Sequence, residues 1–114
     1  MSAVTTHILD IASGRPAAGV AVALERRAAA DTWRLVGSGR TDADGRLRRL
    51  MDEGIVLEPG VFRLTFDTAE YFAREGLQAL YPSVVIVFET RAGESHYHIP
   101  LLLSPNGYTT YRGT

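Results

Sequence analysis

The chain contains no cysteine and no lysine, and all twelve of its basic residues are arginine. The lack of cysteine excludes disulfides, thiol nucleophiles and zinc sites built on thiolates. The lack of lysine excludes Schiff-base catalysis by a side chain. Any catalysis must therefore use the three histidines, the carboxylates, the hydroxyl groups or the arginines.

Long apolar runs and strongly basic stretches are also missing. No run approaches the length of a membrane span, and the N-terminus has no apolar core of a signal peptide. The basic residues cluster only as Arg26-Arg27 and Arg48-Arg49, and the formal net charge is -1. We therefore expect no membrane or nucleic-acid partner and a cytoplasmic location. The length of 114 residues predicts one domain spanning residues 1–114.

Short segments of alternating or continuous apolar residues predict strands, separated by turns rich in glycine, proline and aspartate. The expected strands cover residues 4–11, 19–27, 33–40, 47–50, 61–66, 84–88, 96–103 and 108–112. Asp67 is a typical helix N-cap with Glu70 three residues later, and Gly76 can end that helix. The predicted fold is all-β: an antiparallel β-sandwich of seven to eight strands with one short helix.

The last nineteen residues, from His96 to Thr114, predict a hairpin around a turn at residues 104–107 that contains Asn-Gly. Strand side chains alternate between two faces. In the first strand of the hairpin, one face is therefore apolar and suits the core, and the opposite face carries His96 and His98. The same alternation places His7 on the face opposite Val4 and Ile8.

Three histidines, Arg46 and the tail Arg112–Thr114 are the residues best suited to chemistry. Histidine titrates near neutral pH and can take a proton from water and return it to a leaving nitrogen. Arginine can bind carbonyl or anionic oxygens through its planar fork. From the residues alone, two interpretations stay open beside catalysis. Each group can be an ordinary surface residue, or His7, His96 and His98 can form a zinc site.

Several ordered motifs cover nearly the whole chain. They are Thr6-His-Ile-Leu-Asp10, Gly14-Arg-Pro-Ala-Ala-Gly19, Thr41-Asp-Ala-Asp-Gly-Arg46, Phe66-Asp-Thr-Ala-Glu-Tyr-Phe72, Tyr81-Pro-Ser83, His96-Tyr-His-Ile-Pro-Leu-Leu-Leu-Ser-Pro105 and Tyr108-Thr-Thr-Tyr-Arg-Gly113. Together they resemble the 5-hydroxyisourate hydrolases, the transthyretin-related enzymes of urate breakdown. That family ends in Tyr-Arg-Gly-Ser, whereas this chain ends in Thr114. Thyroid-hormone carriers of the transthyretin type share the fold but lack the paired histidines and the Tyr-Arg-Gly ending.

The resemblance implies a hydrolase that opens the six-membered ring of 5-hydroxyisourate to give 2-oxo-4-hydroxy-4-carboxy-5-ureidoimidazoline, without a metal or other cofactor. It implies His7, Arg46 and His98 as catalytic residues, with Tyr111, Arg112, Gly113 and Thr114 joining them in substrate binding. It also implies a homotetramer, a dimer of dimers with its sites between the dimers. The alternatives are a zinc-dependent hydrolase using His7, His96 and His98, and a non-catalytic protein that binds a small ligand.

Overall fold

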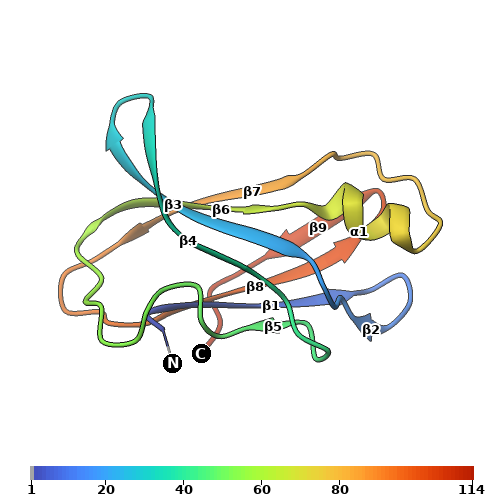
Figure 1. Cartoon of the computed structure of the whole chain (residues 1–114), viewed down its shortest axis with the longest axis horizontal. Coiled ribbons are helices and arrows are strands. Elements are labelled where there is room, and N and C mark those ends of the chain that lie inside the picture. Colours follow the sequence, from blue (N-terminus) through green and yellow to red (C-terminus); the bar gives the residue numbers. More distant parts are fainter. Residues whose placement is uncertain (1) are drawn as a thin grey trace.

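The computed structural model describes residues 2–114 and consists of two packed β-sheets with one short helix at one end (Figure 1). The elements in chain order are β1 (Val4–Asp10), β2 (Arg15–Pro16), β3 (Ala21–Ala29), β4 (Thr32–Arg40), β5 (Arg46–Leu47), β6 (Gly60–Phe66), α1 (Thr68–Arg74), β7 (Val84–Thr90), β8 (Tyr97–Ser104) and β9 (Gly107–Thr110). The predicted all-β sandwich with one helix is confirmed. Within residues 2–114, no helix is long and apolar enough to cross a membrane.

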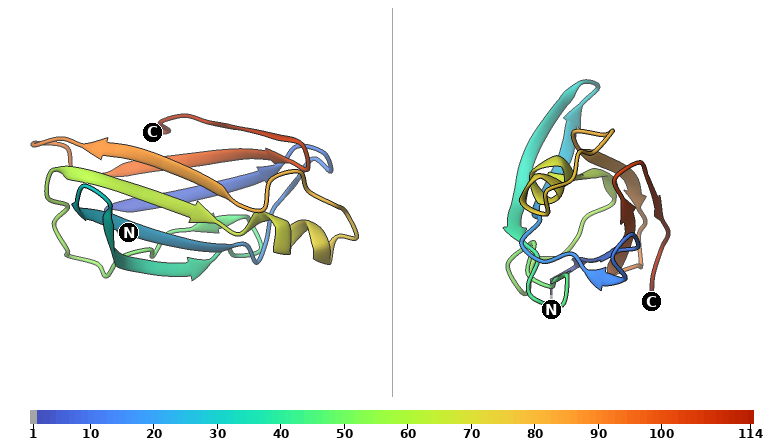
Figure 2. Two further views of the ribbon diagram at one scale, coloured as in Figure 1. Left: turned by 90° about the horizontal axis from the view of Figure 1, so that it is seen from above. Right: turned by 90° about the vertical axis from the view of Figure 1, so that its right-hand side faces the viewer.

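The two sheets have different strand arrangements. One follows the order β4-β3-β6-β7 and is antiparallel throughout. The other follows the order β2-β1-β8-β9, with the short β5 pairing with β1. In this second sheet β1 and β8 run parallel, although an antiparallel sandwich was expected. The pair joins the two ends of the chain, so no hairpin constrains its direction. The end view in Figure 2 shows the two layers facing each other.

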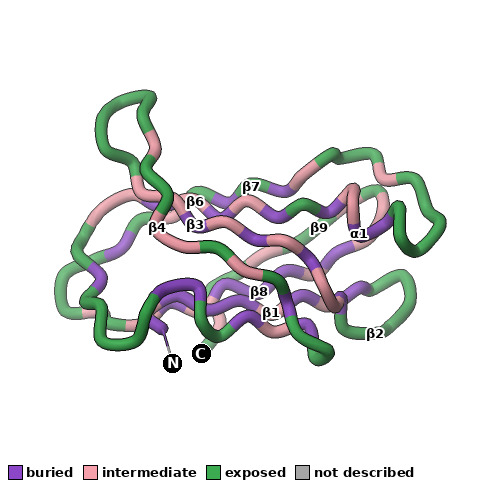
Figure 3. Tube along the Cα trace, viewed as in Figure 1, coloured by how far each residue is buried: buried purple, intermediate pink, exposed green. Residues whose placement is uncertain are grey.

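The core between the sheets follows the predicted alternation of side chains. In β8, Tyr97, Ile99, Leu101 and Leu103 are buried in the core, and His98 between them is only half-buried. In β1, Val4 and Ile8 are fully buried while His7 remains partly exposed. Figure 3 shows burial concentrated along these strands and exposure at the tip of the β3–β4 hairpin. His7 and His98 thus lie on the outer face of the sheet that contains β1 and β8.

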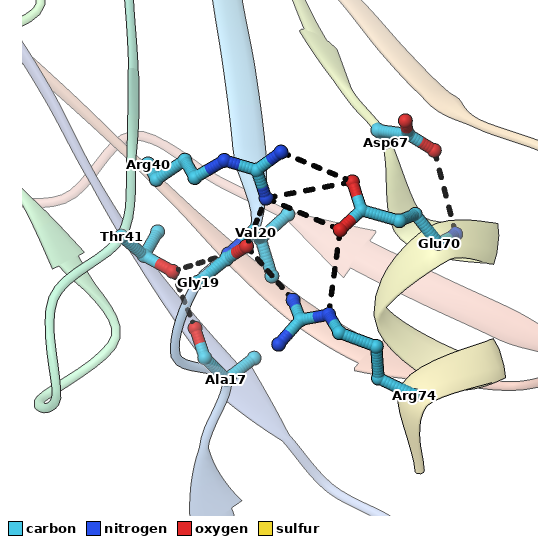
Figure 4. Close-up of polar contacts among 8 residues, drawn as sticks. All are labelled: Ala17, Gly19, Val20, Arg40, Thr41, Asp67, Glu70 and Arg74. Carbon is cyan, nitrogen blue, oxygen red and sulfur yellow. Dashed lines mark hydrogen bonds and ion pairs between the residues drawn. The ribbon is translucent and has the colours of Figure 1, made fainter. Parts of the chain in front are cut away.

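Helix α1 begins as predicted, with the Asp67 carboxylate accepting a hydrogen bond from the Glu70 backbone N–H. Its charged residues attach it to the loop before β3. Arg40 and Arg74 each donate to the Gly19 carbonyl, at 2.9 and 2.8 Å, and both guanidinium groups contact the Glu70 carboxylate (Figure 4). These groups are substantially exposed, so the network orients the helix more than it stabilises the fold.

The C-terminal hairpin turns where predicted, with Ser104 paired to Gly107 and Pro105-Asn106 between them. Strand β9 ends at Thr110, short of the predicted Arg112. The pairing with β8 is interrupted at Tyr111, opposite Pro100, because proline has no N–H to donate to a neighbouring strand. Pairing resumes in the same register at Gly113, whose N–H donates to the His98 carbonyl at 2.8 Å. The tail therefore stays on the edge of the sheet beyond β9.

Candidate active site

Two histidines and a threonine form the centre of the candidate site. Thr5 of β1 lies directly beside His98 of the parallel strand β8. Its hydroxyl lies 2.8 Å from Nδ1 of His98 and 3.2 Å from Nε2 of His96. Thr5 is buried, and both rings are half-buried. The predicted common face of His96 and His98 is therefore correct, and the buried hydroxyl connects their rings.

Arg46 reaches this face because a tight turn places it beside β1. The Asp42 carboxylate accepts hydrogen bonds from the backbone N–H groups of Asp44 and Arg46, and these bonds lower the pKa of Asp42. Gly45 has a φ of 75°, and a Cβ there would approach the Ile8 carbonyl oxygen to 2.4 Å. Only glycine lets the turn come this close to β1.

His7 sits opposite Arg46 in the β1–β5 pair, so the two side chains share the outer face. Nε2 of His7 lies 2.9 Å from the Asp44 carbonyl oxygen. A carbonyl only accepts hydrogen bonds, so Nε2 of His7 carries a proton. His7 and His98 are two residues apart along neighbouring strands, which separates their Cα atoms by roughly 8 Å.

Residues from three distant parts of the chain line one small hollow on the outer face. Its volume is about 130 Å³. The residues that line it are Thr5, Thr6, Arg46, Arg48, His96, His98 and Thr114. The structure thus brings together Arg46, His98 and Thr114 of the predicted site. His7 pairs with Arg46 but is not among the residues that line the hollow.

The surroundings of His98 disfavour its protonated form. Burial is the main cause that lowers its pKa below the usual 6.5, followed by the positive charge of Arg46 and then of the other two histidines. His98 is therefore largely neutral at neutral pH, as a group that accepts a proton from water must be.

The tail residues divide between two sides of the sheet. Arg112 lies over the Tyr97 ring, with 4.3 Å between its guanidinium carbon and the ring centroid, and it donates to Glu94 at 3.0 Å and to the His96 carbonyl at 3.2 Å. The Tyr97 hydroxyl donates to the same carboxylate at 2.8 Å. Arg112 and Tyr111 line a separate pocket, of about 230 Å³, beside β7. In the single chain, Arg112 therefore anchors the tail and does not line the hollow.

Metal binding depends on the spacing of possible ligands. No three histidine, aspartate, glutamate or cysteine side chains within residues 2–114 are grouped so that they could hold a metal ion. The arrangement of His7, His96 and His98 gives the zinc hypothesis no support.

Sequence reasoning missed Thr5 and Arg48 as members of this site. Thr5 is two residues before His7, so strand alternation already placed it on the same outer face. Its position beside His98, however, depends on the register between β1 and β8, which local sequence does not contain.

Comparisons with known proteins cover almost the whole chain. Residues 4–113 match the HIUase/Transthyretin family. A 5-hydroxyisourate hydrolase of Caulobacter vibrioides is 46% identical over 119 residues, covering all of both chains. A mouse protein of the same name is 41% identical, over 99% of this chain and 96% of the relative.

Solved structures of both functional types resemble the chain. The Klebsiella pneumoniae 5-hydroxyisourate hydrolase has a TM-score of 0.84 and 35% identity, covering 99% of this chain and all of that one. Sea bream transthyretin in complex with thyroxine has a TM-score of 0.90 and 34% identity, covering 98% of this chain and 95% of that one. Matched over almost its whole length by the family and by these relatives, the chain belongs to the HIUase/Transthyretin family.

Proposed function

We propose that the protein hydrolyses 5-hydroxyisourate in urate degradation, giving 2-oxo-4-hydroxy-4-carboxy-5-ureidoimidazoline. The observation that carries this proposal is the meeting of neutral His98, cationic Arg46 and the Thr114 terminus in one hollow. The names of the full-length bacterial and mouse relatives support the same reaction. Overall shape does not separate the two functional types, because the transthyretin also superimposes closely.

The reaction adds water across a cyclic amide bond. A histidine removes a proton from water as its oxygen attacks the ring carbonyl carbon, and the proton then passes to the leaving ring nitrogen as the carbon–nitrogen bond breaks. Arg46 binds the carbonyl oxygen and stabilises the negative charge that develops on it. We assign His98 as the base, with His7 positioned by its bond to Asp44 to bind the substrate from the adjacent strand. Thr114 orients the substrate or water from the tail.

We also propose that the enzyme works as a tetramer built from two dimers. The hollow of about 130 Å³ in one chain is smaller than typical ligand pockets of roughly 300–1,000 Å³, and we infer that a second chain completes it. The outer strands β7 and β9 leave an edge unpaired in each sheet, and Val85 and Val87 of β7 are 46% and 58% exposed. Pairing such edges between two copies is a common way to cover them.

The direct test is to add purified protein to freshly generated 5-hydroxyisourate and follow its loss against the spontaneous reaction, with and without a chelator. We expect acceleration in both conditions. Loss no faster than in buffer would refute the proposed function, and activity abolished by EDTA but restored by zinc would support the zinc-dependent alternative. Measuring thyroxine binding by equilibrium dialysis in parallel tests the ligand-binding alternative suggested by the transthyretin similarity.

A further inference from the structure

The hydrogen bonds of the buried Thr5 hydroxyl constrain the protons on two histidines. A hydroxyl group has one proton to donate and two lone pairs that accept. Its two partners within residues 2–114 are both imidazole nitrogens, Nδ1 of His98 and Nε2 of His96. If the hydroxyl donates to one ring, the other ring must donate to it. The tautomers of His96 and His98 are therefore coupled.

We propose that Thr5 relays a proton between His98 and His96, which makes Thr5 a positioning residue and His96 the partner that stores the proton. In the resting state, Nδ1–H of His98 donates to Oγ1 of Thr5, and the hydroxyl donates to Nε2 of His96. This leaves Nε2 of His98 without a proton, so it can accept one from a water molecule in the hollow. The inference rests on the proposed hydrolysis and specifies how its base is maintained.

The proton movements balance. As water attacks the substrate carbonyl, Nε2 of His98 takes a proton from the water, Nδ1 passes its proton to Oγ1, and the hydroxyl proton moves to Nε2 of His96. His98 ends neutral with a proton on Nε2, and His96 holds the positive charge. When the carbon–nitrogen bond breaks, Nε2 of His98 gives its proton to the leaving nitrogen and the relay runs backwards. Each group then returns to its resting state.

The surroundings explain why moving the charge is useful. His98 lines the hollow together with Arg46, whose positive charge opposes a second cation at this position. His96 lies just before β8, next to the 91–95 loop. It is two residues farther than His98 from the level at which His7 pairs with Arg46. Transfer to His96 removes positive charge from the ring that contacts the reacting water.

Substitutions at Thr5 separate its hydroxyl from its shape. Thr5→Val preserves the volume but removes the relay, and we expect kcat to fall by about 10- to 100-fold with KM changed less than about twofold. Thr5→Ser restores the hydroxyl and should recover activity to within a few-fold. Thr32→Val, at an exposed position of β4, is the matched control and should behave like the wild type.

Substitution of His96 distinguishes a relay from simple positioning of His98. The relay predicts that His96→Ala loses as much kcat as Thr5→Val, and that the double variant is no worse than either single one. If Thr5 only holds the His98 ring, His96→Ala stays near wild-type activity, and the relay is overturned. Full activity in Thr5→Val overturns it as well.

A measurement on the resting protein keeps this inference separate from the proposed function. Long-range ¹H–¹⁵N spectra of the imidazoles should show His98 protonated at Nδ1 and His96 unprotonated at Nε2, with this bias lost in Thr5→Val. A wild type that shows the coupled tautomers but does not hydrolyse 5-hydroxyisourate would refute the proposed function and support the coupling between His96 and His98. Tautomers unchanged by Thr5→Val would refute the coupling whatever the activity.

Discussion

Replacing Gly113 by alanine tests whether the tail must lie against His98. A Cβ at this position would lie 2.6 Å from Cδ2 of His98 and 3.1 Å from Cγ of Pro100. Carbon atoms in favourable contact are about 3.5–4.0 Å apart, so the tail and the His98 ring must separate by roughly 1 Å. Pro100 blocks part of the space into which the methyl could move. The separation also lengthens the 2.8 Å bond from the Gly113 N–H to the His98 carbonyl.

The expected consequence is a loss of turnover without a loss of fold. A displacement of about 1 Å at a reacting group can cost on the order of a hundredfold in rate. We therefore expect kcat for 5-hydroxyisourate in Gly113→Ala to fall by about that factor. Gly113 lies beyond the last strand, so its substitution should change stability by less than about 0.5 kcal/mol and the melting temperature by less than about 3 °C.

Gly107 in the same hairpin supplies the control. A Cβ at Gly107 meets only the Ser104 hydroxyl, at 3.8 Å, and Gly107→Ala should keep both kcat and the melting temperature of the wild type. Wild-type kcat in Gly113→Ala would refute the reasoning, because it would mean that the tail does not need to stay on His98. An equal loss in both variants would point to a general effect on the hairpin.

Four further outcomes follow from the same structure. His98→Ala and Arg46→Ala should each lower kcat/KM for 5-hydroxyisourate by about a hundredfold or more, measured against spontaneous hydrolysis. The pKa of His98, followed by NMR, should lie below 6.5 and rise in Arg46→Gln. In the wild type, the unfolded state binds this proton more readily than the folded state, so the contribution of His98 to stability is present above pH 6.5 and is lost as the pH falls from 6.5 toward the lowered pKa. Tyr71→Phe removes the 2.8 Å bond to the buried Asp10 carboxylate and should cost about 1–3 kcal/mol in urea unfolding, with activity retained in the folded protein. Thr114→Ser should change turnover only a few-fold, whereas a tag fused after Thr114 should abolish most activity and one at the N-terminus should not.

Much of the fold could be predicted because strands and caps are local. The alternation of Tyr97, Ile99 and Leu101 defined which face of β8 is buried, and Asp67 defined the start of the helix. The parallel pairing of β1 and β8 could not be predicted in this way. It depends on packing between segments more than ninety residues apart, and no turn between them specifies a direction.

Part of the candidate site was also open to prediction from the chain alone. Histidine and arginine stand out by their chemistry, so His98 and Arg46 were natural candidates. Thr5 did not stand out, because threonine is common in strands for its shape. Its importance comes from the register that places it beside His98, and that register appears only when both strands are in place.

The ending Tyr-Arg-Gly-Thr shows why residue type does not reveal a residue's task in a site. Arg112 is the tail's only cation, and its chemistry suggested substrate binding. The continued register places it opposite Ile99 on the core side, where Glu94 and the Tyr97 ring hold it. Gly113 has no chemistry of its own, yet its bare Cα lets the backbone lie against His98. In the single chain, Arg112 secures the tail, and its role in substrate binding stays a prediction. Gly113 determines how closely the tail backbone approaches His98.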